Sequence, residues 1–164
     1  MSNNKYLNKR NILTKLIFIL MLLLTIICVP IPVKAKEKKI KEKDIRLMSS
    51  IIYAEAGNQC YAGQLAVGIV IKNRIENKAF PNTLKKVIYQ KNQFGPVRNG
   101  SLKKALKLYD KNKIPSRTIK AAKNALKGEK KVKYKGKYIN MKKYYYFNTN
   151  VKNCKIKIQN HEFK

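Results

Sequence analysis

Acidic residues are scarce in this chain of 164 residues, which has 8 Asp and Glu against 38 Lys and Arg and a formal net charge of +30. Three cysteines and one histidine are too few for a Cys₄ or Cys₂His₂ zinc site. The sequence has no glycine-rich phosphate loop and no dinucleotide-binding fingerprint. We therefore expect no metal and no cofactor, and we expect anionic partners.

The first 35 residues have the order of a signal peptide. Basic residues precede an apolar run over 16–29, which is short for a membrane-spanning helix. Pro30 and Pro32 end this run, and Ala35 stands where a signal peptidase reads a small side chain. The pattern predicts cleavage after Ala35 and a protein that is secreted or held in the cell envelope. An uncleaved membrane anchor is the alternative.

Residues 36–44 are predicted to be a basic linker, and 45–164 a single domain. Apolar spacing predicts a first helix capped by Asp44 and a second helix that begins at Tyr61. The second helix is apolar on nearly every side, so we expect it to be the buried central one. Further helices are predicted over 84–90, 102–109 and 116–127, with a loop over 91–100. Strand-like patterns follow at 134–138, 144–147 and 156–158, so the expected fold class is α+β with a small antiparallel C-terminal sheet. Cys60 and Cys154 are candidates for a disulfide, with two free buried thiols as the alternative.

Glu55 is the acidic residue whose position indicates chemistry. It follows Ile51 and Ile52 by four and three residues, which places it on the apolar face of the first helix. Desolvation there raises a carboxyl pKa toward neutrality, as a general acid acting on a glycosidic oxygen requires. The alternatives are that Glu55 pairs with Arg74 or a lysine, or that it caps the end of its helix. No serine or cysteine stands in a nucleophile motif, and His161 is expected to be structural.

A set of short segments spread over residues 45–164 points to a known family. The segments are Tyr53-Ala54-Glu55-Ala56, Gly63-Gln64-Leu65-Ala66-Val67, Asn73-Arg74, Phe80-Pro81-Asn82-Thr83, Val87-Ile88-Tyr89, Gln93-Phe94-Gly95-Pro96-Val97-Arg98-Asn99-Gly100, Tyr146-Phe147-Asn148 and Ile158-Gln159-Asn160-His161-Glu162-Phe163. In order and spacing, this set resembles the spore cortex-lytic enzyme (SleB/CwlJ) family of cell-wall hydrolases. The resemblance implies a lysozyme-like, mainly helical α+β fold without a cofactor, and cleavage of peptidoglycan glycan strands.

The family's catalytic glutamate falls on Glu55. The best-known branch of the family consists of lytic transglycosylases, and the resemblance implies degradation of spore cortex during germination, with general wall hydrolysis as the alternative. Inverting and retaining glycosidases need two carboxylates, whereas a transglycosylase needs one because the substrate's own 6-hydroxyl attacks the anomeric carbon. Asn73, Gln93, Phe94 and Tyr146 are the residues that we expect to bind the glycan. Packing of the aromatic side chains in the core is the alternative.

Two features differ from the family pattern. Gly57-Asn58-Gln59 stands where the family usually has Arg-Gly-Glu, so a neighbouring arginine and a second acidic group are missing. We also see none of the wall-binding repeats of some relatives, and we expect the lysine-rich surface to bind peptidoglycan and other anionic wall polymers instead. A cationic wall-binding protein without catalysis is the rival function. We expect no specific nucleic-acid partner, since no such motif is visible, and we expect a monomer.

Overall fold

The structure is a computed structural model, and it describes residues 12, 14–21 and 40–164. The chain divides into two units, residues 1–38 and 39–164. The described residues of the first unit are helical and exposed. None of the described helices is long and apolar enough to cross a membrane. The predicted cleavage site after Ala35 and the first part of the basic linker lie outside the described residues.

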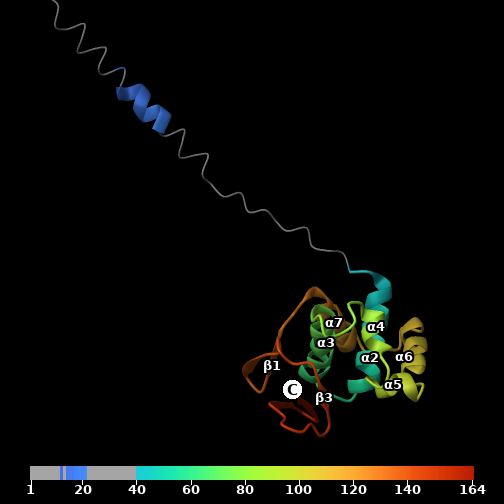
Figure 1. Cartoon of the computed structure of the whole chain (residues 1–164). Helices are drawn as coiled ribbons and strands as arrows, with labels where there is room; N and C mark the ends of the chain where they lie inside the picture. The colour runs from blue at the N-terminus through green and yellow to red at the C-terminus, as the bar shows by residue number, and fades with distance from the viewer. Residues whose placement is uncertain (1–11, 13, 22–39) are drawn as a thin grey trace, which may run out of the picture. The chain divides into compact units, whose positions relative to one another are not determined.

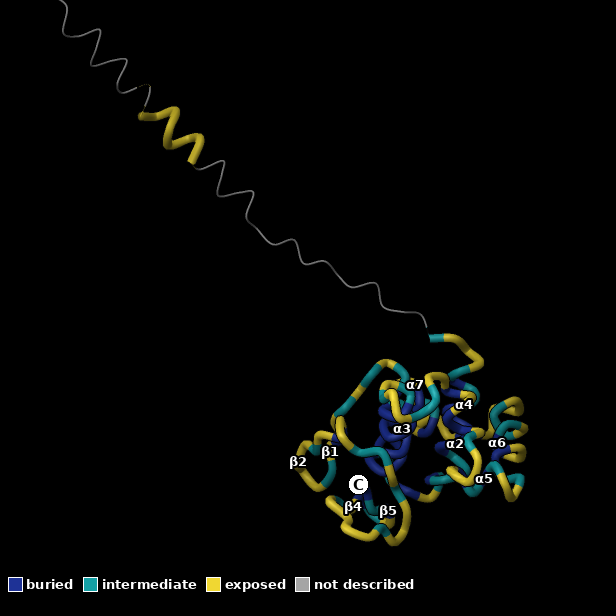
Figure 2. The backbone as a smooth tube through the Cα atoms, viewed as in Figure 1, coloured by how far each residue is buried: buried dark blue, intermediate teal, exposed yellow. Residues whose placement is uncertain are grey.

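Within residues 40–164, helices surround one buried helix (Figure 1). They are α2 (Glu42–Ala56), α3 (Tyr61–Glu76), α4 (Leu84–Ile88), α5 (Gly95–Arg98), α6 (Ser101–Asp110) and α7 (Ser116–Lys127). Twelve of the 16 residues of α3 are buried, and α3 packs against α2, α4 and α7. Figure 2 shows this buried segment at the centre of the unit. The predicted central helix is therefore confirmed.

The packing of α3 against α7 depends on small side chains. A Cβ atom at Gly68 would lie 2.8 Å from the Cβ of Ala125, so glycine is what allows the two helices to approach this closely. Helix α7 ends where the sequence predicts, because Gly128 adopts the left-handed conformation with φ 97°.

Helix α2 begins at Glu42, so the prediction that Asp44 is its N-cap is wrong. The capping position is Lys41, whose side chain makes no capping hydrogen bond. Glu42 and Asp44 lie in the first turn instead, where the helix dipole favours acidic groups. The hydroxyl of Tyr109 on α6 donates a 2.6 Å hydrogen bond to the Glu42 carboxylate. The last residues of the predicted linker therefore belong to the helical unit.

The segment between α3 and α6 contains two short helices. Thr83 caps α4 by accepting a hydrogen bond from the backbone N–H of Lys86, at 3.3 Å, as its position before the helix predicts. The expected loop over 91–100 is only partly a loop, because α5 forms within it with Pro96 in its first turn.

The strands form two small antiparallel sheets where the sequence predicted one. Strands β1 (Lys131–Tyr134) and β2 (Lys137–Asn140) make a hairpin, and β3 (Phe147–Asn148), β4 (Ile156–Ile158) and β5 (His161–Phe163) form a sheet in the order β3-β5-β4. Tyr145 and Tyr146 precede β3, and both of their backbone N–H groups donate to the carbonyl of Lys164, at 2.8 Å each. The mainly helical α+β class is confirmed.

The two cysteines of this unit are not bridged. Cys60 is half-buried and Cys154 is exposed, and both are free. The Sγ atom of Cys154 instead contacts the carbonyl of Ile156 at 3.2 Å. The structure therefore differs from both expectations, since it contains neither a disulfide nor a pair of buried thiols.

Candidate active site

Glu55 lies on the last turn of α2 and is half-buried. Burial raises the pKa of its carboxyl from 4.5 to about 7, and desolvation is the cause of this rise. Among the described residues, no side chain forms a hydrogen bond or an ion pair with this carboxyl. Glu55 therefore carries a proton for much of the time near neutral pH and can donate it to a bound molecule.

The alternatives for Glu55 do not hold in the structure. The guanidinium of Arg74 donates from Nε to the carbonyl of Tyr145 at 2.7 Å, so it does not pair with Glu55. Beyond the helix end, the N–H groups of Gly57 and Gln59 donate to backbone carbonyls at 2.9 Å each. These groups are satisfied without the Glu55 carboxyl, which leaves it available.

The loop that follows Glu55 is held by a buried amide from α3. The Nε2 atom of Gln64 donates to the carbonyls of Gly57, at 3.3 Å, and of Gln59, at 3.1 Å. Its Oε1 atom accepts a 2.9 Å hydrogen bond from the hydroxyl of Thr118 on α7. The Gln64 amide therefore joins the loop after α2 to α3 and, through Thr118, to α7, and together these bonds fix the backbone next to Glu55.

The C-terminal strands dock on the same loop. The backbone N–H of Cys60 donates to the side-chain oxygen of Gln159, and the N–H of Asn160 donates to Oε1 of Gln59 at 3.1 Å. The N–H of Gln159 in turn donates to the hydroxyl of Tyr134 on β1 at 3.1 Å. Residues about a hundred positions apart in sequence thus meet beside Glu55.

Arg74 lies at the centre of an aromatic cluster. Its side chain is 4% exposed, and its guanidinium carbon lies 5.3 to 5.4 Å from the ring centres of Phe80, Phe94 and Tyr146. Burial lowers the pKa of this guanidinium, and its Nη1 atom has no hydrogen-bond partner. Cation–π contacts with three rings take the place of a carboxylate partner. The cluster joins α3 to the segment that leads into β3.

The four residues predicted to bind the glycan have different surroundings. Tyr146 is 50% exposed, and Gln93 is exposed next to α5. Phe94 is 2% exposed and packs against Arg74 and Phe147, with a ring distance of 6.3 Å to the latter. Phe94 therefore packs in the core, as the alternative to glycan binding predicts, whereas half of Tyr146 is exposed to solvent. The burial of Phe94 argues against its predicted contact with the substrate.

Asn73 is also buried, and its amide is fully used inside the protein. Its Nδ2 atom donates to the carbonyls of Met141 and Tyr144 at 2.7 and 2.8 Å, and its Oδ1 atom accepts from Nζ of Lys130 at 2.8 Å. This side chain therefore fixes the chain after β2, which argues against its predicted contact with the substrate.

The other described acidic side chains of the helical unit do not supply a second free carboxylate at this site. Asp110 is held by Arg46 at 2.6 Å, Glu76 by Lys130 at 2.6 Å, and Glu162 by Lys157 at 3.1 Å. Glu129 accepts hydrogen bonds from the backbone N–H groups of Lys130 and Lys131 at 3.0 and 2.9 Å, and Glu42 and Asp44 lie in the first turn of α2, at the other end of the helix from Glu55. Among the described residues, no group of three His, Cys, Asp or Glu side chains has the arrangement of a metal site. The chemistry of this site therefore centres on one carboxyl group.

Comparison with known proteins identifies the family of this chain. A family model described as Cell Wall Hydrolase matches residues 58–164. The chain belongs to the cell wall hydrolase family. The matched range includes the Gln64 bonds, the Arg74 cluster and both sheets, and it begins three residues after Glu55.

Curated relatives of this cell wall hydrolase are named spore cortex-lytic enzymes. The proteins from Bacillus cereus and Oceanobacillus iheyensis are each 39% identical over 61 residues, which is 37% of this chain. Those matches cover 24% and 22% of the relatives, so the chain spans about a quarter of the length of the curated relatives it matches. The resemblance to the spore cortex-lytic (SleB/CwlJ) family is confirmed.

Two solved structures share the fold. One is the catalytic domain of the germination-specific lytic transglycosylase SleB from Bacillus anthracis, with 24% identity and a TM-score of 0.56, covering 77% of this chain and 97% of that domain. The other is the catalytic domain of the SleB protein from Bacillus cereus, with 25% identity and a TM-score of 0.57, covering 77% and 92%. These likenesses support the expected lysozyme-like, mainly helical α+β fold.

Several residues that shape the site in this cell wall hydrolase were not predicted from the sequence. Gln64 stands in the family segment, but its bonds to the loop after Glu55 depend on the meeting of α2, α3 and α7. An amide within the otherwise apolar stretch 61–71 was the available signal, because buried amides need partners. Arg117 on α7 also donates to the carbonyl of Gly57 at 3.4 Å, and nothing in its local sequence indicates this contact.

His161 has the structural role that the sequence predicted. It is buried on β5, with its ring 5.4 Å from that of Phe147 and 6.3 Å from that of Phe163. Burial lowers its pKa, and its Nδ1 atom has no hydrogen-bond partner. The ring therefore stays neutral as part of the packed sheet.

Proposed function

We propose that this cell wall hydrolase cleaves peptidoglycan glycan strands as a lytic transglycosylase, with Glu55 as its single catalytic group. The observation that carries the proposal is an unpaired carboxyl, half-buried at a helix end, with a pKa of about 7. A general acid is most effective when its pKa lies near the working pH, because it must be protonated and yet able to release the proton.

The proposed reaction uses Glu55 twice. Its protonated carboxyl donates to the glycosidic oxygen while the bond from that oxygen to the anomeric carbon breaks. The 6-hydroxyl of the same sugar then attacks the anomeric carbon, and the Glu55 carboxylate takes the proton of this hydroxyl. One bond is exchanged for another, no water is consumed, and Glu55 returns to its protonated state. The product ends in a 1,6-anhydro sugar.

The distribution of acidic groups supports this mechanism over two-carboxylate hydrolysis. A second carboxylate would have to lie about 5 to 9.5 Å from the first. Glu42 and Asp44 lie at the opposite end of α2, about 20 and about 16 Å away along the axis at 1.5 Å per residue. Asp110, Glu76 and Glu162 are held by basic partners, and Glu129 accepts two backbone N–H groups.

The proposed biological setting is spore cortex during germination, after export with removal of residues 1–35. The names of the relatives support the cortex as substrate, and the order of basic, apolar and small residues supports export. General muramidase activity on the vegetative wall is the alternative. The net charge of +30 favours a second candidate, a monomeric cationic protein that binds anionic wall polymers without cleaving them.

The test compares Glu55→Gln with Glu76→Gln and Glu162→Gln on purified cortex and vegetative wall, with mass spectrometry of the released fragments. Glutamine keeps the shape of the side chain but cannot donate a comparable proton, so we expect E55Q to lose a factor of about 10² to 10⁴ in activity. The two control variants should keep most of it.

Anhydro ends would support the transglycosylase, and reducing ends would require water and a second base. Near-normal turnover by E55Q would refute the assignment, and intact strands with the wild-type protein would leave only the binding function.

A further inference from the structure

We propose that the β1–β2 hairpin is a docking surface for anionic peptidoglycan, which it directs toward Glu55. This inference rests on the proposed function for the identity of the polymer, and on the hairpin's own geometry and charge for its location. The hairpin consists of residues 131–140.

The two faces of the hairpin differ. The strand register pairs Val132 with Ile139 and Lys133 with Tyr138. Val132 is completely buried, so its face packs against the helices, and β1 contacts α3. The opposite face presents Lys133 and Tyr138 to solvent, and Tyr138 is 72% exposed. An aromatic side chain this exposed contributes nothing to the core, and it is available for contact with a partner.

Positive charge on the hairpin is not neutralised by the protein. Residues 130–161 contain ten lysines and no Asp or Glu. The four hairpin lysines, at positions 131, 133, 135 and 137, are all exposed. Among the described residues, none of the four forms an ion pair, whereas Lys130 just before the hairpin pairs with Glu76. The Nζ atom of Lys133 lies 5.7 Å from the ring centre of Tyr138, so cations and an aromatic face share one surface.

The hairpin extends along α3 toward the catalytic loop. At one end, Lys130 contacts Glu76 and Asn73 near the C-terminus of α3. At the other end, the hydroxyl of Tyr134 is linked through Gln159 to Cys60, at the start of α3 and five residues after Glu55. A polymer lying along the hairpin therefore reaches the loop beside Glu55.

The surface matches a polymer that has both sugar rings and repeated carboxylates. Lysine ammonium groups attract the carboxylates, and an exposed tyrosine ring offers a flat apolar surface to a sugar. The stem peptides of peptidoglycan carry such carboxylates along the glycan strand. A polymer of glycerol phosphate offers charge without rings, so it uses the lysines and leaves Tyr138 without a partner.

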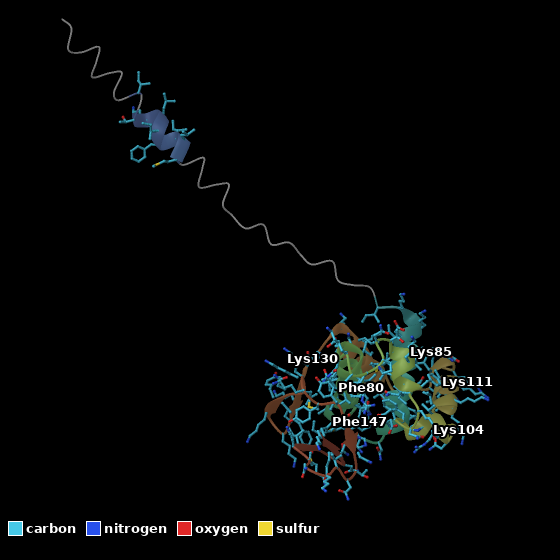
Figure 3. The ribbon with its side chains drawn as sticks, viewed as in Figure 1. Phe80, Lys85, Lys104, Lys111, Lys130 and Phe147 are labelled. Carbon is cyan, nitrogen blue, oxygen red and sulfur yellow. The ribbon has the colours of Figure 1, made fainter. Side chains whose placement is uncertain are left out.

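The experiment measures binding of the full chain to peptidoglycan sacculi stripped of teichoic acid, by co-sedimentation over a range of salt concentrations. All proteins carry Glu55→Gln so that the sacculi stay intact. One variant replaces the four hairpin lysines by Gln, and a second carries Tyr138→Ala. The matched control replaces four exposed lysines on and just after α6, at positions 103, 104, 107 and 111, and so removes the same charge elsewhere. Figure 3 shows Lys104 and Lys111 well apart from Lys130.

We expect the hairpin variant to bind at least about tenfold more weakly at low salt and to depend less on salt, because fewer counterions are released. The affinity of the control variant for sacculi should fall by less than about threefold, because salt screens charges that lie far from the docking surface. Tyr138→Ala should weaken binding about threefold at all salt concentrations, because a stacking contact does not depend on charge. Sacculi whose carboxylates have been converted to amides should bind all the proteins weakly.

Equal losses in the hairpin and α6 variants would overturn the proposal, since binding would then follow total charge. Unchanged binding to amidated sacculi, or tighter binding to single-stranded DNA than to sacculi at the same salt, would overturn it as well. The assay measures binding and not cleavage, so turnover by E55Q would refute the proposed function without affecting the docking result. Conversely, equal losses in the hairpin and α6 variants would refute the docking surface, but they would not bear on whether the wild-type protein releases anhydro fragments.

Discussion

Replacing Glu55 by Gln should stabilise the protein at alkaline pH while it removes activity. The carboxyl has a pKa of 4.5 in the unfolded chain and about 7 in the folded one, so folding takes up a proton between these values. The stability that the protonated form contributes is fully present below pH 4.5 and is lost as the pH rises through about 7. Above that pH the folded protein must hold an ionised, half-buried carboxylate without a partner.

The size of the effect follows from the same two values. A rise from 4.5 to about 7 corresponds to about 3 kcal/mol at 1.36 kcal/mol per pH unit. Because the carboxyl is partly exposed, solvent screens this penalty, and we expect about 1 to 2 kcal/mol. Glutamine is neutral, so the E55Q protein does not have this penalty. At pH 8 the E55Q protein should therefore melt about 3 to 8 °C higher than the wild type.

The assay is thermal or urea unfolding of wild type and E55Q at pH 4 and pH 8, followed by circular dichroism. At pH 4 the two proteins should agree within about 0.5 kcal/mol, since Glu55 is then neutral in both folded and unfolded chains. Lower stability of E55Q at pH 8 would show that Glu55 has a structural partner, and a difference independent of pH would show that ionisation is not its cause. Either result would refute the reasoning.

Glu76→Gln is the matched control because its pH dependence has the opposite sign. Burial alone raises the pKa of Glu76, but the hydrogen bonds from Lys130 and Lys72 outweigh it and lower the pKa. The stability from this group is present above its unfolded pKa and is lost as the pH falls through the folded value. The E76Q variant should therefore be less stable than the wild type at pH 8, with the difference disappearing in acid.

Three further predictions concern positions away from the Glu55 carboxyl. Arg74→Lys should lower the free energy of unfolding by about 2 to 3 kcal/mol in urea titrations, because lysine cannot face three rings and bond the Tyr145 carbonyl at once; an unchanged midpoint would contradict this account. Thr118→Val should cost about 1 to 3 kcal/mol, because it leaves the buried Gln64 oxygen without its donor. Thr149→Val, at an exposed position, should change stability by less than about 0.5 kcal/mol, and equal losses would speak against the buried bond. N-terminal sequencing of exported protein should begin near residue 36, and an intact first residue would refute cleavage.

The sequence by itself determined the features that depend on spacing and local chemistry. The period of apolar residues placed Glu55 on a buried helical face and identified the central helix at Tyr61. Thr83 and Gly128 marked the start and end of their helices, because capping depends on a few neighbouring residues. The start of the first helix was misplaced, since Glu42 is held by a hydroxyl on α6 that local pattern does not reveal.

Only the tertiary structure decided which side chains meet. The sequence left open whether Arg74 pairs with Glu55, and the folded chain surrounds Arg74 with rings and leaves Glu55 unpaired. Asn73 and Phe94 lie in segments that the family resemblance linked to substrate, yet packing buries both. The hydrogen bond from Cys60, in the loop after Glu55, to Gln159 joins residues about a hundred positions apart. Such contacts have no signature in local periodicity, because they form only when several helices have packed.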